Sequence, residues 1–133
     1  MVSKLDKLRE LLPWKRKGYW VLDKFNTKDP HEGDQKVLAQ MLEHGADLKR
    51  ERHVVHYLYF PDNAARAAAQ DKLNQQGYEI RHGVDYGDVR PKSLIAERTG
   101  LVNDDVVNKE RELLTTIAET GDGEYDGWEA ALD

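Results

Sequence analysis

Cysteine is missing from the sequence, and serine is scarce. Without cysteine the chain can hold no disulfide, no thiolate zinc site and no cysteine nucleophile. The only serines are Ser3 and Ser93, and neither lies in the G-x-S-x-G context of a serine nucleophile. No G-x-x-x-x-G-K-[ST] phosphate loop occurs either. The sequence offers no convincing catalytic constellation, so we expect a protein that is not an enzyme.

Long hydrophobic runs are also lacking. No stretch approaches the ~18 apolar residues that a membrane-spanning helix needs. Residues 1–18, MVSKLDKLRELLPWKRKG, carry charges throughout and contain no apolar segment typical of a signal peptide. We therefore expect a cytoplasmic protein that makes no contact with a membrane.

Histidine is present, but its spacing does not favour a metal site. His53 and His56 lie three positions apart on a predicted strand, so their side chains point to opposite faces. His56 and His82 could share a face if their strands are neighbours, but two imidazoles without a third ligand make a weak site. We expect neither a metal ion nor another cofactor.

Acidic residues outnumber basic ones, and the basic residues are unevenly placed. The formal net charge is −5, whereas a non-specific nucleic-acid binder is usually basic because it neutralises phosphates. Lysine and arginine are frequent in residues 1–30, but from Glu119 onward the only charged residues are acids. The two ends of the chain are either simply solvated or involved in binding. In the second case they bind different partners, or they bind each other.

Tyr57 and Tyr59 raise the question of RNA binding, because they share one face of a strand predicted at 53–60. RNA-binding modules with a related strand order stack bases on aromatic residues of their two central strands. The other predicted central strand, at 92–99, has no aromatic residue. We therefore expect no direct contact with nucleic acid. The two tyrosines are then core residues, edge groups that bond through their hydroxyls, or part of a protein-binding surface.

Hydrophobic periodicity predicts alternating strands and helices. Residues 53–60 (HVVHYLYF) are β-branched and aromatic, which is typical of a strand. Apolar stripes that end at glycine predict helices, and apolar–polar alternation predicts further strands. The other predicted elements are a helix at 34–44 begun by Asp34 and ended by Gly45, an alanine-rich helix at 64–76 capped by Asp62 or Asn63 and closed by Gly77, strands at 77–86 and 92–99, a long helix capped by Asn103 or Asp104 and ended by Gly121, and a short strand at 123–128.

From residue 53 the order is strand, helix, strand, strand, helix, strand. This order predicts an α+β protein with a ferredoxin-like (βαββαβ) antiparallel sheet and two helices on one face. The predicted N-terminal additions are a short helix at 2–12, a basic and aromatic arm at 14–25, and the helix at 34–44. Because residues 26–33 are loop-like in composition, we expect an appendage at 1–32 and a main domain at 33–133.

The segment GEYDGWEAALD, at 123–133, combines large aromatic residues with acids. In one interpretation it is structural: Asp126-Gly127 forms a tight turn or bulge, and Tyr125 and Trp128 plug the sheet edge or pack on a helix end. In the other, the two aromatic residues anchor a protein partner within an acidic rim. The two interpretations are compatible. The segment also contains several acids, but nothing in it places two carboxylates around a substrate, as acid–base catalysis would need. The candidate partner-binding residues are Glu124, Tyr125, Asp126, Trp128, Glu129, Tyr57 and Tyr59.

Four segments together resemble the family of the regulator of ribonuclease E activity B, which are small bacterial inhibitors of ribonuclease E. The segments are DQKVLAQMLEHGADL at 34–48, HVVHYLYFPD at 53–62, LNQQGYEI at 73–80 and GEYDGWE at 123–129. The last is the most distinctive, because Tyr-Asp-Gly-Trp is not a generic turn composition. The basic, aromatic arm at 14–25 corresponds to no part of this pattern.

The resemblance implies a ferredoxin-like fold, a cytoplasmic location, and action by binding without catalysis. It also implies a protein partner, ribonuclease E or its non-catalytic scaffold region, and a protein that inhibits RNA degradation. The alternative is an interaction module with an unrelated protein partner, such as an immunity-type protein that neutralises a toxin. A third reading, a small enzyme with an unrecognised site, would need a large apolar pocket with convergent polar groups.

Overall fold

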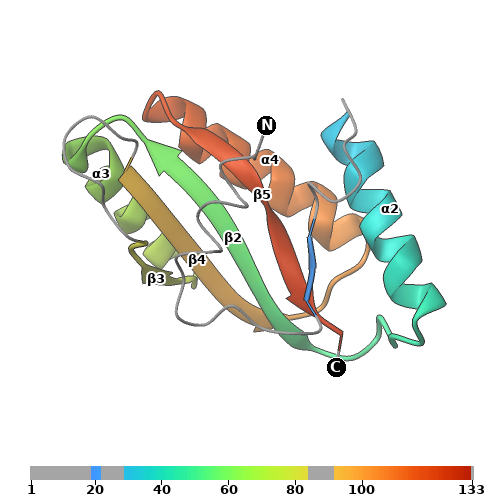
Figure 1. The fold of residues 1–133 in the computed structure, drawn as a ribbon. Helices are drawn as coiled ribbons and strands as arrows, with labels where there is room; N and C mark the ends of the chain where they lie inside the picture. Colours follow the sequence, from blue (N-terminus) through green and yellow to red (C-terminus); the bar gives the residue numbers. More distant parts are fainter. Residues whose placement is uncertain (1–18, 22–28, 84–91, 133) are drawn as a thin grey trace.

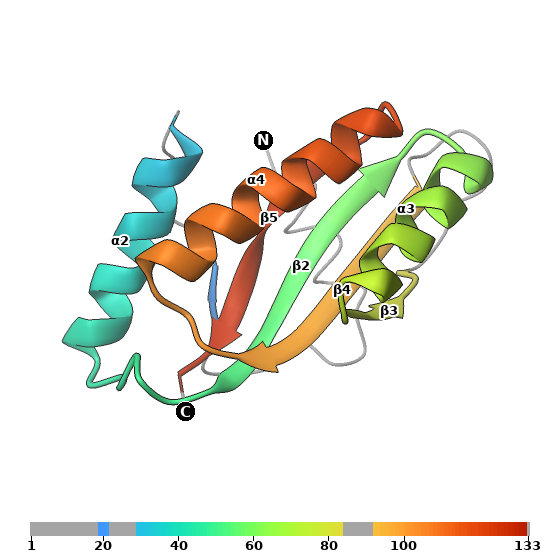
Figure 2. The same cartoon turned by 180° about the vertical axis from the view of Figure 1, so that it is seen from behind.

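The computed structural model of the protein describes residues 19–21, 29–83 and 92–132 (Figure 1). Its strands form one sheet, and its helices lie on one face of that sheet (Figures 1 and 2). The strands are β1 (Tyr19–Val21), β2 (Arg52–Phe60), β3 (Glu79–Arg81), β4 (Lys92–Gly100) and β5 (Glu124–Ala131). The helices are α2 (Pro30–Glu43), α3 (Asn63–Gln75) and α4 (Asp104–Thr120).

The strand order is β1-β5-β2-β4-β3, and all neighbouring strands are antiparallel. The part β5-β2-β4-β3 is the order that a βαββαβ chain adopts when two helices cross one face of its sheet. The predicted ferredoxin-like α+β fold is therefore confirmed. β1 belongs to the expected appendage, and it adds a fifth strand beside β5. The predicted helix at 2–12 and most of the arm at 14–25 lie outside the described residues, and the domain boundary at 32 stays a prediction.

β2 occupies the centre of the sheet and pairs along its length with β4 and β5. The pairing with β5 shifts register between Tyr57 and Leu58, opposite a glycine in the left-handed conformation, Gly127 with φ 114°. This confirms the bulge predicted at Asp126-Gly127. The bulge changes the alternation of side chains, so Tyr125 and Trp128 both point to the face covered by helices.

Two predicted helix caps are present. The Asp62 side chain accepts a hydrogen bond from the Ala65 backbone N–H at 2.8 Å, and Asn103 accepts one from Val106 at 3.0 Å. Each satisfies a backbone N–H that has no partner within its helix. Gly77 follows α3 with φ 91°, which is the conformation that ends many helices.

The prediction that Asp34 begins the first of these helices was wrong. α2 starts at Pro30, and its cap is Asp29, which accepts a hydrogen bond from the His31 N–H at 3.0 Å. Proline favours the first helical position because its φ is already helical and it has no N–H to satisfy. The loop predicted at 26–33 is therefore helical from residue 30, and Asp34 is buried within the helix.

Two strand lengths also differ from prediction. The strand predicted at 77–86 is reduced to β3, Glu79–Arg81, and residues 84–91 lie outside the described part. Tyr78, just before β3, is buried in the core. In contrast, β5 continues past the predicted end at 128 to Ala131, because β1 and β2 pair with it on both sides there.

The core consists of two apolar clusters between the sheet and the helices. α3 contributes to the first cluster, α2 to the second, and α4 to both. Figure 2 shows α4 between the other two helices. The buried members of the first are Leu58, Phe60, Ala69, Leu73, Tyr78, Leu94, Ala96, Leu114, Ile117 and Ala118. Those of the second are Val37, Leu38, Met41, Val54, Val102, Val107, Trp128 and Ala130. No helix in the described part of the chain is long and apolar enough to cross a membrane.

Candidate functional site

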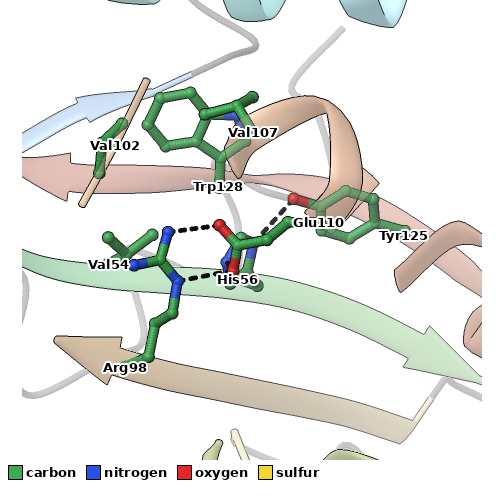
Figure 3. A pocket seen from close by; sticks show the side chains of 8 residues that line it. All are labelled: Val54, His56, Arg98, Val102, Val107, Glu110, Tyr125 and Trp128. Atoms are coloured by element: carbon green, nitrogen blue, oxygen red, sulfur yellow. Dashed lines mark hydrogen bonds and ion pairs between the residues drawn. The ribbon is translucent and has the colours of Figure 1, made fainter. Parts of the chain in front are cut away.

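A layer of polar side chains lies at the junction of the two clusters (Figure 3). We call it the central polar network; its members are His56, Tyr78, Arg98, Glu110 and Tyr125. β2, β4, β5 and α4 all contribute to it, so it joins the sheet to the helix that crosses it. Only 2% of His56 is exposed, and 8% of Glu110. Groups this deeply buried need partners inside the protein.

Glu110 is the centre of this network. Its Oε2 accepts hydrogen bonds from Arg98 Nε and the Tyr78 hydroxyl, both at 2.6 Å, and lies 3.0 Å from His56 Nε2. Arg98 Nη2 also donates to Oε1, so the guanidinium is bidentate. His56 Nδ1 lies 2.8 Å from the Tyr125 hydroxyl. If His56 Nε2–H donates to Glu110 and the Tyr125 hydroxyl donates to Nδ1, both ring nitrogens of His56 are hydrogen-bonded.

The surroundings shift the pKa values of Glu110 and Tyr78 further away from neutral pH. Burial by itself raises the pKa of Glu110, but His56 and Arg98 outweigh it and hold that pKa well below its usual range. Burial and the Glu110 carboxylate raise the pKa of Tyr78 well above its usual range. A general acid or base works best with a pKa near the working pH. Glu110 and Tyr78 are thus suited to holding the fold together and not to proton transfer near neutral pH.

A second polar group, the Asp34 cluster (Asp34, Arg111 and Trp128), ties α2 to α4 and β5. Asp34 accepts from Arg111 Nε at 2.6 Å and Nη2 at 2.9 Å, and from the Trp128 indole N–H at 2.7 Å. The Arg111 guanidinium also lies 4.9 Å from the centre of the Tyr125 ring. Tyr125 therefore contacts both polar groups, and a continuous set of buried contacts runs from α2 to β4.

The closely packed residues of Figure 3 leave no room among them for a water molecule. A substrate site needs a cavity in which a reacting group can meet such side chains. In the described ranges, no three His, Asp or Glu side chains are grouped so as to hold a metal ion. This arrangement joins elements of the fold, and it provides no space for a small-molecule substrate.

The expectations for the histidines hold in part. His53 and His56 lie on opposite faces: His53 Nε2 is 2.8 Å from Glu97 Oε1, while His56 faces α4. His56 and His82 are not on neighbouring strands, because β4 separates β2 from β3. His82 Nε2 instead lies 2.8 Å from Gln70 Oε1 on α3.

The candidate partner-binding residues do not share one surface. Trp128 and Tyr125 face the helices, whereas the Tyr57 hydroxyl donates to Glu129 on the other side of the sheet. Glu124 is exposed, Tyr125 and Asp126 are partly buried, and the other four are buried: Tyr57, Tyr59, Trp128 and Glu129. These positions agree with the structural interpretation of GEYDGWE. A role for the seven residues in binding a partner stays a prediction.

Sequence reasoning missed the Asp34 cluster and the central polar network, although a signal for both was present. Asp34 lies in the apolar stripe of α2, one turn before Val37 and Leu38. Glu110 and Arg111 occupy the inward turn of α4 between Val107 and Leu114. A charged residue on the apolar side of a helix needs a buried partner. The identity of that partner depends on the tertiary fold.

Comparison with known proteins agrees with the sequence resemblance. A search of the curated proteins finds no match. The family model described as regulator of ribonuclease activity B matches residues 31–130. The match begins in α2 and ends in β5, so it contains the Asp34 cluster and the central polar network. The chain therefore belongs to the regulator of ribonuclease activity B family.

Proposed function

We propose that the protein is a non-catalytic inhibitor of RNA degradation that binds a ribonuclease of the ribonuclease E type by protein–protein contact. The observation that carries the proposal is the family match over 31–130, because this family regulates ribonuclease activity. We place the protein in the bacterial cytoplasm, where such a nuclease meets its RNA. The scaffold region of the nuclease is the proposed binding partner.

Action by binding is supported by the way the polar side chains are used. Glu110 and Asp34 each accept hydrogen bonds from an arginine inside the fold. The residues of the central polar network are packed too closely to leave space for a substrate between them. Such networks stabilise one arrangement of the elements around them. A rigid domain with its reactive groups turned inward is suited to presenting a surface to a partner.

One end of the molecule offers a surface of suitable charge. α4 ends and β5 begins there (Figure 1), and three exposed acids cluster, which we call the acidic end: Glu119, Asp122 and Glu124. The sequence contains no lysine or arginine after Arg111, so no cation follows on α4 or β5. Exposed charges of one sign accelerate association with a partner of opposite sign. We propose that the acidic end steers the protein toward a basic part of the nuclease.

The test measures association with purified ribonuclease E at low and high salt. We expect Glu119→Lys with Glu124→Lys to reduce the association rate about ten-fold at low salt, and less at high salt. The matched control is Glu43→Lys with Glu51→Lys, which makes the same charge change at the end of α2 and before β2. Equal rates for the two double variants would exclude steering by the acidic end.

A second assay tests the function itself. Adding the protein to ribonuclease E and a fluorescent RNA should slow cleavage, while the protein alone should neither cleave nor bind the RNA. Unchanged cleavage at saturating protein would contradict the proposal. If the protein retains a different protein from cell lysate, such as a toxin, the alternative of an unrelated interaction module would replace it.

A further inference from the structure

A hollow of about 410 Å³ lies between the first turn of α2 and the middle of α4. Figure 2 shows the two helices side by side on the same face of the sheet. The residues that line it are Pro30, His31, Arg111, Glu112, Thr115 and Thr116. Its size falls within the roughly 300–1,000 Å³ of sites that hold sizeable ligands. Neither the central polar network nor the acidic end accounts for this hollow.

The floor of the hollow is not an anion site. Arg111 is its only arginine, and both the Nε and Nη2 groups of that guanidinium donate to Asp34. Burial lowers the pKa of Arg111, but the hydrogen bond with Asp34 and the charges around it, Asp29 included, raise it overall. The positive charge is therefore already balanced by carboxylates within the fold, and little of it is left to attract an anion.

The rim of the hollow is acidic. Glu112 lines it and is exposed, and Asp105 and Glu119 lie seven residues before and after it on α4. Seven residues are close to two turns, so the three acids follow one side of the helix. Lys109, the exposed cation of α4, lies seven residues before Thr116 and therefore on the same side of the helix, where it is one cation among these three acids.

The wall of the hollow suits the aliphatic part of a long side chain. Pro30 and the methyl groups of Thr115 and Thr116 provide apolar contact. His31 Nδ1 lies 3.1 Å from Asn108 Oδ1, which connects α2 to α4 beside the hollow. Lysine and arginine bury their methylene groups on such surfaces while the charged end stays near water or an acid.

We propose that this hollow binds an arginine- or lysine-rich segment of the ribonuclease. The segment lays a basic side chain across Pro30 and Thr116, with its charged group at Glu112. Neighbouring basic residues of the segment follow α4 toward Glu119 in the acidic end. This inference rests on the proposed function and adds to it the place where the nuclease is held.

The test fills the hollow and leaves the fold intact. Thr116→Arg introduces a long cation into the hollow at an exposed helical position, and Ala67→Arg makes the same charge change at an exposed position of α3. We expect Thr116→Arg to raise the Kd for ribonuclease E at least ten-fold and Ala67→Arg to leave it within two-fold. Glu112→Gln, which removes only the acid, should raise it by a smaller factor. Thermal unfolding of all three variants should match that of the natural chain.

A second measurement separates this inference from the proposed function. Synthetic peptides covering the most arginine-rich stretches of ribonuclease E are titrated into the isotope-labelled protein, and shifts of the backbone amide signals are followed by NMR. Changes concentrated at residues 31 and 112–116 support the hollow even if the intact nuclease is not bound. If the nuclease binds and Thr116→Arg binds equally well, the inference is overturned and the proposed function stands. Peptide-induced changes confined to other elements would also overturn it.

Discussion

The indole N–H of Trp128 donates a hydrogen bond of 2.7 Å to Oδ1 of Asp34. This bond joins β5 to α2, although the two residues are 94 positions apart in the sequence. The same carboxylate holds the Arg111 guanidinium of α4. Only 1% of Asp34 and 2% of Trp128 are exposed. One buried acid therefore fixes α2, α4 and β5 in relation to one another. The tryptophan of the Tyr-Asp-Gly-Trp segment acts inside the fold.

We expect Asp34→Ala to lower the free energy of unfolding by about 3–5 kcal/mol, because it leaves Arg111 buried without a counter-charge. Trp128→Phe, which retains the Asp34–Arg111 pair, should cost less. Urea unfolding followed by circular dichroism measures both. Glu32→Ala on the exposed side of α2 is the control and should change the free energy by about 0.5 kcal/mol or less. An Asp34→Ala value as small as that of the control would show that the cluster adds little.

Gly123 lies where α4 leads into β5, and the structure leaves no space there for a side chain. A Cβ at this position would lie 2.3 Å from the Tyr59 carbonyl oxygen and 2.7 Å from a ring carbon of Phe60. We expect Gly123→Ala to reduce stability by roughly 1–3 kcal/mol, since backbone atoms must move to relieve the contact.

Gly45 provides a contrasting position for the same measurement. A Cβ there would meet no atom within 4 Å, but its φ of 83° disfavours any side chain. The cost of Gly45→Ala therefore comes from backbone conformation alone. Thermal unfolding of both variants tests the steric account, and an unchanged melting temperature for Gly123→Ala would refute it.

Because of Glu110, we expect the free energy of unfolding to fall in acid. Its pKa in the folded state is held well below its usual range, whereas in the unfolded chain it returns to about 4.3. The stability it contributes is therefore fully present above about pH 4.3, and it is lost as the pH falls toward the folded-state pKa. The limiting slope is about 1.4 kcal/mol per pH unit for one proton.

The test compares the natural chain with Glu110→Gln. We expect the variant to be less stable at neutral pH, since Arg98 loses its charged partner. Its free energy of unfolding should also fall less steeply between about pH 4.5 and 3. Denaturant unfolding at a series of pH values measures both effects. Parallel pH profiles for the two proteins would show that Glu110 is not the source of the acid response.

Much of the architecture could be predicted because it follows from local chemistry. The β-branched and aromatic residues at 53–60 form the central strand, and Asp62 and Asn103 cap their helices. Asp34 shows the limit of this reasoning. An aspartate ahead of an apolar stripe fits a cap equally well, and only Pro30 indicated the earlier start. A local pattern cannot reveal that the carboxylate is held by residues far away in the sequence.

The candidate site was harder to predict for the same reason. The seven proposed partner residues are aromatic and acidic groups, a composition that suggests aromatic anchors within an acidic rim. In the fold, the bulge at Gly127 turns Tyr125 and Trp128 toward the helices, and a glutamate binds Tyr57 across the sheet. Which face a β-strand residue occupies depends on the register, and a shift of one residue reverses it.

The central position of β2 has a consequence for the order of synthesis. β2 leaves the ribosome before both of its neighbours, and β5 follows only after α3, β3, β4 and α4. At roughly 5–20 residues per second, the apolar strand HVVHYLYF waits seconds for its second partner. During that time its backbone groups can pair with another chain. The nascent protein therefore depends on rapid packing of α3 against β2, or on a chaperone, to stay free of aggregation until β5 completes the sheet.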